Sequence, residues 1–224
     1  TAGNKPMNVL SRRKFLRIGL VSSAATITLA GNNAVGSLLP FTPAEAEGPF
    51  YPITPQADKD EDLTQIRGHR AIADGQPIYV TGQVMNHQGQ PLANAKVEIW
   101  QANAKGRYRH PRDPNPAPMD NHFQGWAIVT TNEQGRFRFK TIKPGAYPAS
   151  AHWTRPPHIH FKISKAHYQE LITQMYFPDE RHNEADLLLQ QKTPFERSLM
   201  IATKEAPYNT IEVFQFPIVL RTTI

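Results

Sequence analysis

The 224-residue sequence contains no cysteine. This absence excludes disulfide bonds and thiolate ligands, so any bound metal must be held by nitrogen and oxygen atoms. The sequence also lacks any run of about eighteen apolar residues without polar breaks, and we therefore predict no transmembrane helix in the mature chain. With 39% hydrophobic residues, 20 prolines and 13 glycines, the chain is long enough for one globular domain with a substantial core.

The excess positive charge is concentrated near the N-terminus. Residues 1–46 contain five basic residues and one acidic residue, which account for +4 of the net charge of +6. The rest of the chain therefore carries about +2. Such a small charge gives little support for a nucleic-acid partner, and we expect none.

The same segment has the parts of an export signal in the expected order. Met7 can serve as the start, which leaves residues 1–6 as an upstream extension. "SRRKFL" (11–16) carries paired arginines, an apolar stretch follows over 18–30, and "AEA" (44–46) has the small-x-small pattern of a cleavage site. This resembles a twin-arginine signal and implies a bacterial, periplasmic or otherwise exported protein. The alternative is a basic amphipathic segment that stays attached.

We therefore expect a signal peptide and upstream extension over residues 1–46 and one domain over residues 47–224. After residue 46, short runs of alternating or apolar residues are separated by clusters of turn residues, and only one stretch, 183–191, favours a short helix. This pattern predicts an all-β fold, an antiparallel β-sandwich with long functional loops and little helix. Strands are expected at 78–85, 95–101, 125–131, 136–142, 158–164, 171–177 and 211–220.

The stretch "RPPHIHF", residues 155–161, contains two histidines at strand spacing. Alternation along a strand places Ile159 and Phe161 on one face and His158 and His160 on the other. Two imidazoles held side by side can bind a metal, although a His-x-His pair also occurs by chance on surface strands. Other residues must decide between these interpretations.

Two tyrosines lie in Gly- and Pro-rich loop segments, where a tyrosine is usually a packing or capping residue. Tyr108 precedes the proline-rich loop 110–120, and Tyr147 lies in a Gly/Pro-rich bend. If both converge with His158 and His160, two phenolates and two imidazoles would form a hard N/O ligand set, which suits Fe(III). Fe(III) with two tyrosinates and one hydroxide carries no net charge, so such a site could be buried.

Five motifs occur in order and together resemble the intradiol ring-cleavage dioxygenases, in particular the β subunits of the protocatechuate 3,4-dioxygenases. The resemblance spans nearly all of residues 47–224. The motifs are "EGPFYP" (47–52), "VEIWQANAKGRYRH" (97–110), "TIKPGAYP" (141–148), "RPPHIHFKI" (155–163) and "LITQMYF" (171–177).

The resemblance implies Fe(III) held by Tyr108, Tyr147, His158 and His160. It implies that the enzyme uses O2 to cleave a catechol ring between its two hydroxylated carbons, yielding a cis,cis-muconic acid, in aromatic compound catabolism. Tyr147 would be the axial phenolate, which leaves the iron when the catechol binds.

Further roles are implied for residues around the ligands. Arg155 would stabilise negative charge on the substrate, with a surface salt bridge as its alternative role. Gln174 would hydrogen-bond a ligand or Arg155, or else face solvent. Trp100 and Tyr51 are weaker candidates for substrate contact, and Trp100 could instead pack beneath a loop.

The sequence also departs from the resembled pattern. Ala149 stands where a large aromatic residue is expected in protocatechuate enzymes, so the pocket can differ in shape. In that branch a second, α-type chain completes the pocket, and this chain could therefore form either a homo-oligomer or a hetero-oligomer with an α-type chain.

Two other functions compete with the dioxygenase interpretation. "VTGQVMNHQGQPLANAKVEIW" (80–100) also resembles the start of transthyretin-like sandwich modules, which bind ligands or proteins without catalysis. A zinc hydrolase could use His158 and His160 with an acidic residue, but the sequence shows no recognisable motif for a third ligand. The candidate acids are Glu98, Asp120 and Asp179.

Overall fold

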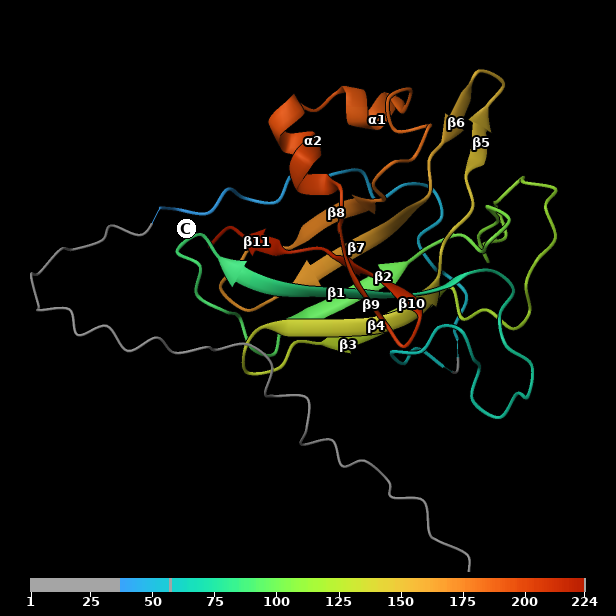
Figure 1. The fold of residues 1–224 in the computed structure, drawn as a ribbon, viewed down its shortest axis with the longest axis horizontal. Coiled ribbons are helices and arrows are strands. Elements are labelled where there is room, and N and C mark those ends of the chain that lie inside the picture. The colour runs from blue at the N-terminus through green and yellow to red at the C-terminus, as the bar shows by residue number, and fades with distance from the viewer. Residues whose placement is uncertain (1–36, 57, 224) are drawn as a thin grey trace, which may run out of the picture. The chain divides into compact units, whose positions relative to one another are not determined.

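The computed structural model describes residues 37–56 and 58–223. The paired arginines and the apolar stretch of the predicted signal lie outside these residues. The described chain forms two packed β-sheets, a short β-hairpin and two short helices (Figure 1). This arrangement confirms the predicted β-sandwich with little helix.

Every predicted strand has a counterpart, but the predicted strand 211–220 is divided in two, and the strands at 147–150, 153–155 and 203–208 were not predicted. In β4, Phe137 and Phe139 are buried while Arg136 and Arg138 are exposed. The elements are β1 Pro77–Asn86, β2 Lys96–Trp100, β3 Trp126–Thr130, β4 Arg136–Ile142, β5 Tyr147–Ser150, β6 Trp153–Arg155, β7 His158–Ser164, β8 Leu171–Tyr176, α1 Leu187–Gln190, α2 Pro194–Met200, β9 Thr203–Tyr208, β10 Ile211–Gln215 and β11 Ile218–Leu220.

The two large sheets differ in their strand pairing. The four-stranded sheet has the order β3-β2-β7-β8, and all its pairs are antiparallel. In the five-stranded sheet, β1 pairs antiparallel with β4 but parallel with both β10 and β11. Alternation predicts the faces of a strand but not its neighbours, so these parallel pairs could not be anticipated.

The hydrophobic core lies between the two sheets. Phe139 of β4 contacts Phe161 of β7 with their ring centroids 5.9 Å apart, and Phe216 lies 5.2 Å from Phe161 on another side. Ile159, Phe161 and Ile163 are fully buried in this core, as their alternation predicts. The opposite face of β7 is thereby left for His158 and His160.

The two short helices, α1 and α2, lie over one end of the four-stranded sheet, close to β8 and beside the β5–β6 hairpin (Figure 1). The predicted helix over 183–191 is present as α1, which Asp186 caps. The sequence analysis missed α2. The signal for α2 was present, because Thr193 and Glu196 form a capping box with Pro194 at the first turn.

Residues 39–46, here called the N-terminal strap, lie against β8 and β11. The backbone N–H of Thr42 donates to Val219 O (3.2 Å), and the N–H of Glu45 donates to Ile172 O (2.9 Å). At the end of the strap, the Gln174 side-chain amide donates to the carbonyl of Ala46 (2.9 Å). The strap is thus hydrogen-bonded to the domain along its length, and its last residue contacts a predicted site residue.

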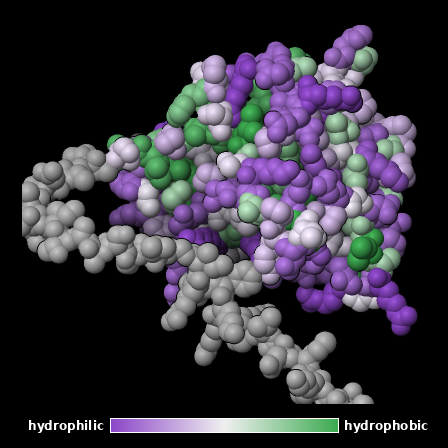
Figure 2. All heavy atoms as spheres, viewed as in Figure 1, coloured by the Kyte–Doolittle hydropathy of each residue, from purple (hydrophilic) through white to green (hydrophobic). Residues whose placement is uncertain are grey.

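The face of the molecule seen in Figure 2 is mostly hydrophilic, with apolar side chains in separate patches. The large apolar side chains that are exposed come from different segments of the described chain, namely Leu38, Ile53, Ile72, Leu187 and Phe195. No helix in the described residues has the length and apolar character needed to span a membrane.

Candidate active site

Strand register brings the predicted site residues together. Across β2, β7 and β8, Trp100 lies opposite His160, and His160 lies opposite Gln174. In the β5–β6 hairpin, Tyr147 lies opposite Arg155. Paired residues in a ladder have Cα atoms about 5 Å apart, so each pairing fixes two site residues as neighbours.

Tyr108 reaches the histidines from the long loop between β2 and β3. The Asp113 carboxylate accepts a hydrogen bond from the backbone N–H of Tyr108 (2.7 Å), which holds this part of the loop. The Tyr108 hydroxyl oxygen lies 3.2 Å from His158 Nε2 and 3.0 Å from His160 Nε2. The phenol and the two imidazoles therefore converge on one point.

Tyr147 completes this group from the side of the hairpin. Its ring lies edge-on to Tyr108, with centroids 5.7 Å apart, and its centroid is also 5.7 Å from that of His158. Tyr147 is 8% exposed, whereas Tyr108, His158 and His160 are 2–3% exposed. Of the four predicted ligands, Tyr147 is the most accessible.

The two imidazoles are held by different means. The Nδ1–H of His158 donates to Pro156 O (2.7 Å), which leaves Nε2 with a free lone pair toward Tyr108. The ring of His160 stacks on Trp100, with centroids 4.9 Å apart and an interplanar angle of 13°. Gly48 lies against the edge of the His160 ring, so that a Cβ there would be 3.3 Å from Cε1.

Burial keeps all four groups neutral in the absence of a Lewis acid. Burial, followed by the charge of Arg155, lowers the pKa of His158 well below its ordinary value and that of His160 to about 3. Burial also raises the pKa of the Tyr108 phenol well above its ordinary value, and Tyr147 raises it further. Neutral imidazoles can bind a metal directly, whereas a phenol requires a strong Lewis acid to displace its proton.

Arg155 lies in a buried network next to these groups. Its Nε donates to Asp186 Oδ1 (2.9 Å), and its Nη2 donates to Gln174 Oε1 (2.7 Å) and to the Tyr176 hydroxyl (2.9 Å). The expected hydrogen bond between Gln174 and Arg155 is therefore present. Burial opposes the charge of Arg155, but Tyr176 and Asp186 raise its pKa above the ordinary value.

A cavity of about 330 Å³ opens beside Tyr147, Arg155 and Gln174. Its other walls are largely apolar and come from the strap end, the long loop, the hairpin and α1. They include Phe50, Pro114, Pro148, Ala149, Trp153 and Leu188. Three of the predicted site residues therefore face a pocket with the size and apolar walls of a small-molecule site.

Trp100 and Tyr51 do not line this cavity. Trp100 lies behind His160, and the Tyr51 ring packs edge-on against Trp100 with centroids 5.0 Å apart. The Tyr51 hydroxyl donates to Glu98 Oε1 (2.7 Å), which also accepts from Trp126 Nε1 (2.9 Å). In these positions Trp100 and Tyr51 support the His160 ring. The sequence had suggested direct substrate contact for both residues.

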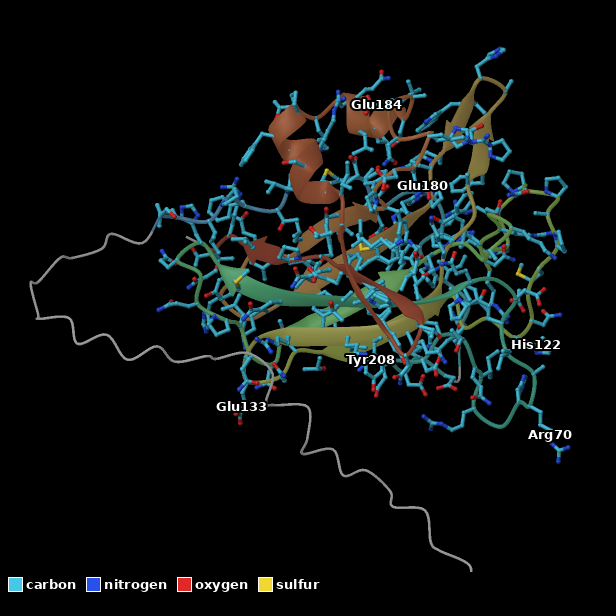
Figure 3. The ribbon with its side chains drawn as sticks, viewed as in Figure 1. Arg70, His122, Glu133, Glu180, Glu184 and Tyr208 are labelled. Atoms are coloured by element: carbon cyan, nitrogen blue, oxygen red, sulfur yellow. The ribbon has the colours of Figure 1, made fainter. Side chains whose placement is uncertain are left out.

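The acids proposed for a zinc hydrolase do not join the histidines. In residues 37–56 and 58–223, no three or more His, Cys, Asp or Glu side chains cluster as a metal site. Glu98 is engaged by Tyr51 and Trp126. The Asp120 carboxylate accepts from the backbone N–H groups of Asp74 (2.8 Å) and His122 (2.8 Å), and the side chain of His122 lies at the edge of the molecule (Figure 3).

The sequence analysis missed Asp186 and Tyr176. Asp186 lies just before α1, on the segment marked by Glu180 and Glu184 in Figure 3, and its carboxylate also accepts from Trp153 Nε1 (3.0 Å) and the backbone N–H of Leu189 (3.3 Å). Tyr176 follows Gln174 by two residues on the same strand face, so alternation could have found it. For Asp186 the only signal was its position as a helix cap.

Comparison with known proteins identifies relatives over most of the described domain. Residues 46–222 match the family described as dioxygenase. The protocatechuate 3,4-dioxygenase beta chain of Burkholderia cepacia is 44% identical over 140 residues, which cover 59% of this chain and 57% of that protein. The catechol 1,2-dioxygenase of Acinetobacter baylyi is 32% identical over 60% of this chain and 45% of that protein. The chain thus spans about half the length of these curated relatives.

Solved structures share the fold. The dioxygenase domain of a carbohydrate-binding fusion protein from Streptomyces sp. SirexAA-E has a TM-score of 0.62 at 26% identity, covering 82% of this chain and 100% of that chain. The 3-chlorocatechol 1,2-dioxygenase of Rhodococcus opacus has a TM-score of 0.63 at 22% identity, covering 81% and 73%, and at that identity it supports the fold alone. Because the family match covers most of the domain that carries this site, the chain belongs to the dioxygenase family.

Proposed function

We propose that this protein is an Fe(III)-dependent intradiol dioxygenase, which cleaves a catechol-type diol with O2 to a cis,cis-muconate-type dicarboxylic acid. The observation that carries this proposal is the convergence of two phenols and two imidazoles beside a cavity that also contains a buried arginine. The relatives named as protocatechuate and catechol dioxygenases support the same chemistry.

The residues present fit a trivalent iron. Tyr108, Tyr147, His158 and His160 would hold it, because their oxygen and nitrogen donors converge and include no sulfur. Two phenolates compensate most of the charge of Fe(III), which makes a buried site tolerable. When bound, Fe(III) would make a chelated catecholate reactive toward O2.

The chain's own residues would bind the diol and handle its protons. Tyr147 is at the cavity wall, where its phenolate oxygen can accept a proton from a substrate hydroxyl. The Arg155 guanidinium is fixed by Asp186 and Gln174, so its charge is already oriented toward negative charge developing on the ring. The apolar walls around them exclude water from the ring.

The visible spectrum of the purified protein, with metal analysis of the same sample, tests this function. We expect a red-brown protein with about one iron per chain, a band that shifts on anaerobic addition of catechol, and O2 uptake when air is admitted. A protein that stays colourless and inactive after iron reconstitution would reject the proposal and favour a transthyretin-like binding module.

Gly48→Ala is expected to weaken iron binding. Gly48 has φ +78°, where an alanine is strained, and the added Cβ would press on His160. Misplacing one ligand should lower iron affinity by about 10-fold or more. The measurement is iron content after dialysis against a chelator.

Gly68→Ala is the matched control for this variant. Gly68 has φ +85°, but a Cβ there meets no atom within 4 Å. It should therefore impose similar backbone strain and leave iron affinity unchanged. Equal iron loss in both variants would show that strain alone, without pressure on His160, explains the effect.

The assembly is open to a direct test. Similarity to a protein named as a beta chain supports either a homo-oligomer or a complex with an α-type chain. Light scattering on the chain expressed alone and with a candidate α-type chain would distinguish them.

We also propose that the protein is exported through a twin-arginine-type signal. Changing Arg12 and Arg13 together to lysine should abolish accumulation in the periplasm, measured by cell fractionation, while the parent protein is exported. Cleavage after Ala46 would remove the strap that bonds to β8 and β11, so we place processing before Leu39. N-terminal sequencing of the exported protein checks this position.

A further inference from the structure

The cation of the substrate cavity is already paired with a carboxylate of the protein. Arg155 is the sole Lys or Arg among the described residues that line the cavity. Its guanidinium forms a buried ion pair with Asp186, with Nε 2.9 Å from Oδ1, and its Nη2 donates to Gln174 and Tyr176. A carboxylate on the substrate would therefore have to share the positive charge of Arg155 with the carboxylate of Asp186.

The lining of the cavity also includes one acidic residue. Asp113 lines the cavity, and its carboxylate accepts from the backbone N–H groups of Tyr108 (2.7 Å) and Asn115 (2.9 Å). These two hydrogen bonds fix the position of the carboxylate in the loop that borders the cavity. Repulsion between like charges is strong where walls exclude water.

The remaining walls offer contacts to apolar groups. Phe50, Pro114, Pro148 and Leu188 present rings and methyl groups to the cavity. Its volume of about 330 Å³ is near the lower end for small-molecule pockets, which suits one ring with a small substituent. Burying an ionised carboxylate against such walls without a partner is costly.

We propose that this site accepts catechols whose ring carries hydrogen or a small, neutral, apolar substituent, and discriminates against a ring carboxylate. The proposal rests on the proposed ring-cleavage function and specifies its substrate class. Asp113 and the pairing of Arg155 with Asp186 supply the discrimination, while the apolar walls supply the affinity.

The test uses the full-length, iron-loaded protein with three diols: catechol, 4-methylcatechol and 3,4-dihydroxybenzoate. We expect kcat/KM to be at least about tenfold lower for 3,4-dihydroxybenzoate than for 4-methylcatechol, which corresponds to about 1.4 kcal/mol. Anaerobic spectral titration should show the same order in Kd. Equal or better binding and turnover of the carboxylated diol would overturn the proposal.

A charge introduced at Ala149 provides a second test. Ala149 lines the cavity and is exposed to solvent, so a long side chain can be accommodated there. Ala149→Arg should raise the ratio of kcat/KM for 3,4-dihydroxybenzoate over 4-methylcatechol by about tenfold, because it supplies an unpaired cation. Ala149→Gln, the neutral control, should leave this ratio near that of the parent.

The outcomes separate this inference from the proposed function. If none of the three diols is cleaved or shifts the spectrum, the ring-cleavage function itself fails. If the diols are cleaved but the carboxylated one is preferred, or if Ala149→Arg and Ala149→Gln change the ratio equally, only the discrimination against a carboxylate fails.

Discussion

Tyr108→Phe is expected to give a folded, colourless protein that loses iron and does not cleave catechols. Phenylalanine fills the same buried space, so the fold should lose only the hydrogen bonds between the hydroxyl and the two imidazoles, about 1 kcal/mol. Iron affinity should fall by more than about 100-fold, because the most deeply buried anionic ligand is removed. Metal analysis, the visible spectrum and O2 uptake measure these effects.

Tyr79→Phe is a suitable control for this change. Tyr79 lies on β1 of the five-stranded sheet and contacts Arg138 and Tyr208 of the same sheet, whereas His158 and His160 lie on the four-stranded sheet. Its phenol has no role in the proposed site, so iron content and turnover should match those of the parent. If Tyr108→Phe kept full iron and turnover, the assignment of Tyr108 as a ligand would be wrong.

Asp186→Leu is expected to destabilise the protein by about 3–5 kcal/mol and to abolish ring cleavage. Asp186 is completely buried and pairs with Arg155, which is itself 4% exposed. Removing one partner of a buried pair leaves an uncompensated charge. The same carboxylate also accepts from Trp153 Nε1 of the β5–β6 hairpin and from the backbone N–H of Leu189 in α1. The substitution therefore removes an acceptor that the hairpin and the N-terminus of α1 share. Urea unfolding measures the stability loss.

The double variant Arg155→Met, Asp186→Leu separates stability from catalysis. Replacing both members of a buried ion pair by apolar residues is often close to neutral, so the double variant should be more stable than Asp186→Leu alone. Its turnover should nevertheless stay lost, because the cation beside Tyr147 is gone. Recovery of turnover together with stability would show that Arg155 has only a structural role.

Much of this site could be predicted from short-range patterns. Alternation along 158–163 placed His158 and His160 opposite the core residues Ile159 and Phe161, and the structure confirms both faces. The motifs around Tyr108 and Tyr147 predicted the other two converging groups through resemblance to a family. Tyr108 lies in a loop without periodicity, whereas Tyr147, which the sequence placed in a bend, begins the four-residue strand β5. That strand is too short to show alternation, so residue patterns alone could not place either tyrosine.

The network around Arg155 could not be predicted in the same way. Its members come from β6, β8 and the cap of α1, and their contacts depend on how a hairpin and a helix pack over one end of a sheet. The strap contact between Ala46 and Gln174 links residues 128 positions apart. Nothing in either local sequence indicates the other.

Local sequence information was therefore sufficient for the β-rich class, the buried and site-facing sides of β7, and the absence of cysteine thiolate ligands. These properties depend on residue types and on the alternation of side chains along a strand. Both are present in the local sequence, whatever the tertiary structure. Three-dimensional packing was needed to show that Asp186 pairs with Arg155, that Trp100 lies behind His160, and that Asp113 lines the cavity. Each of these contacts joins distant segments, and their pairing is set by the closure of the whole fold.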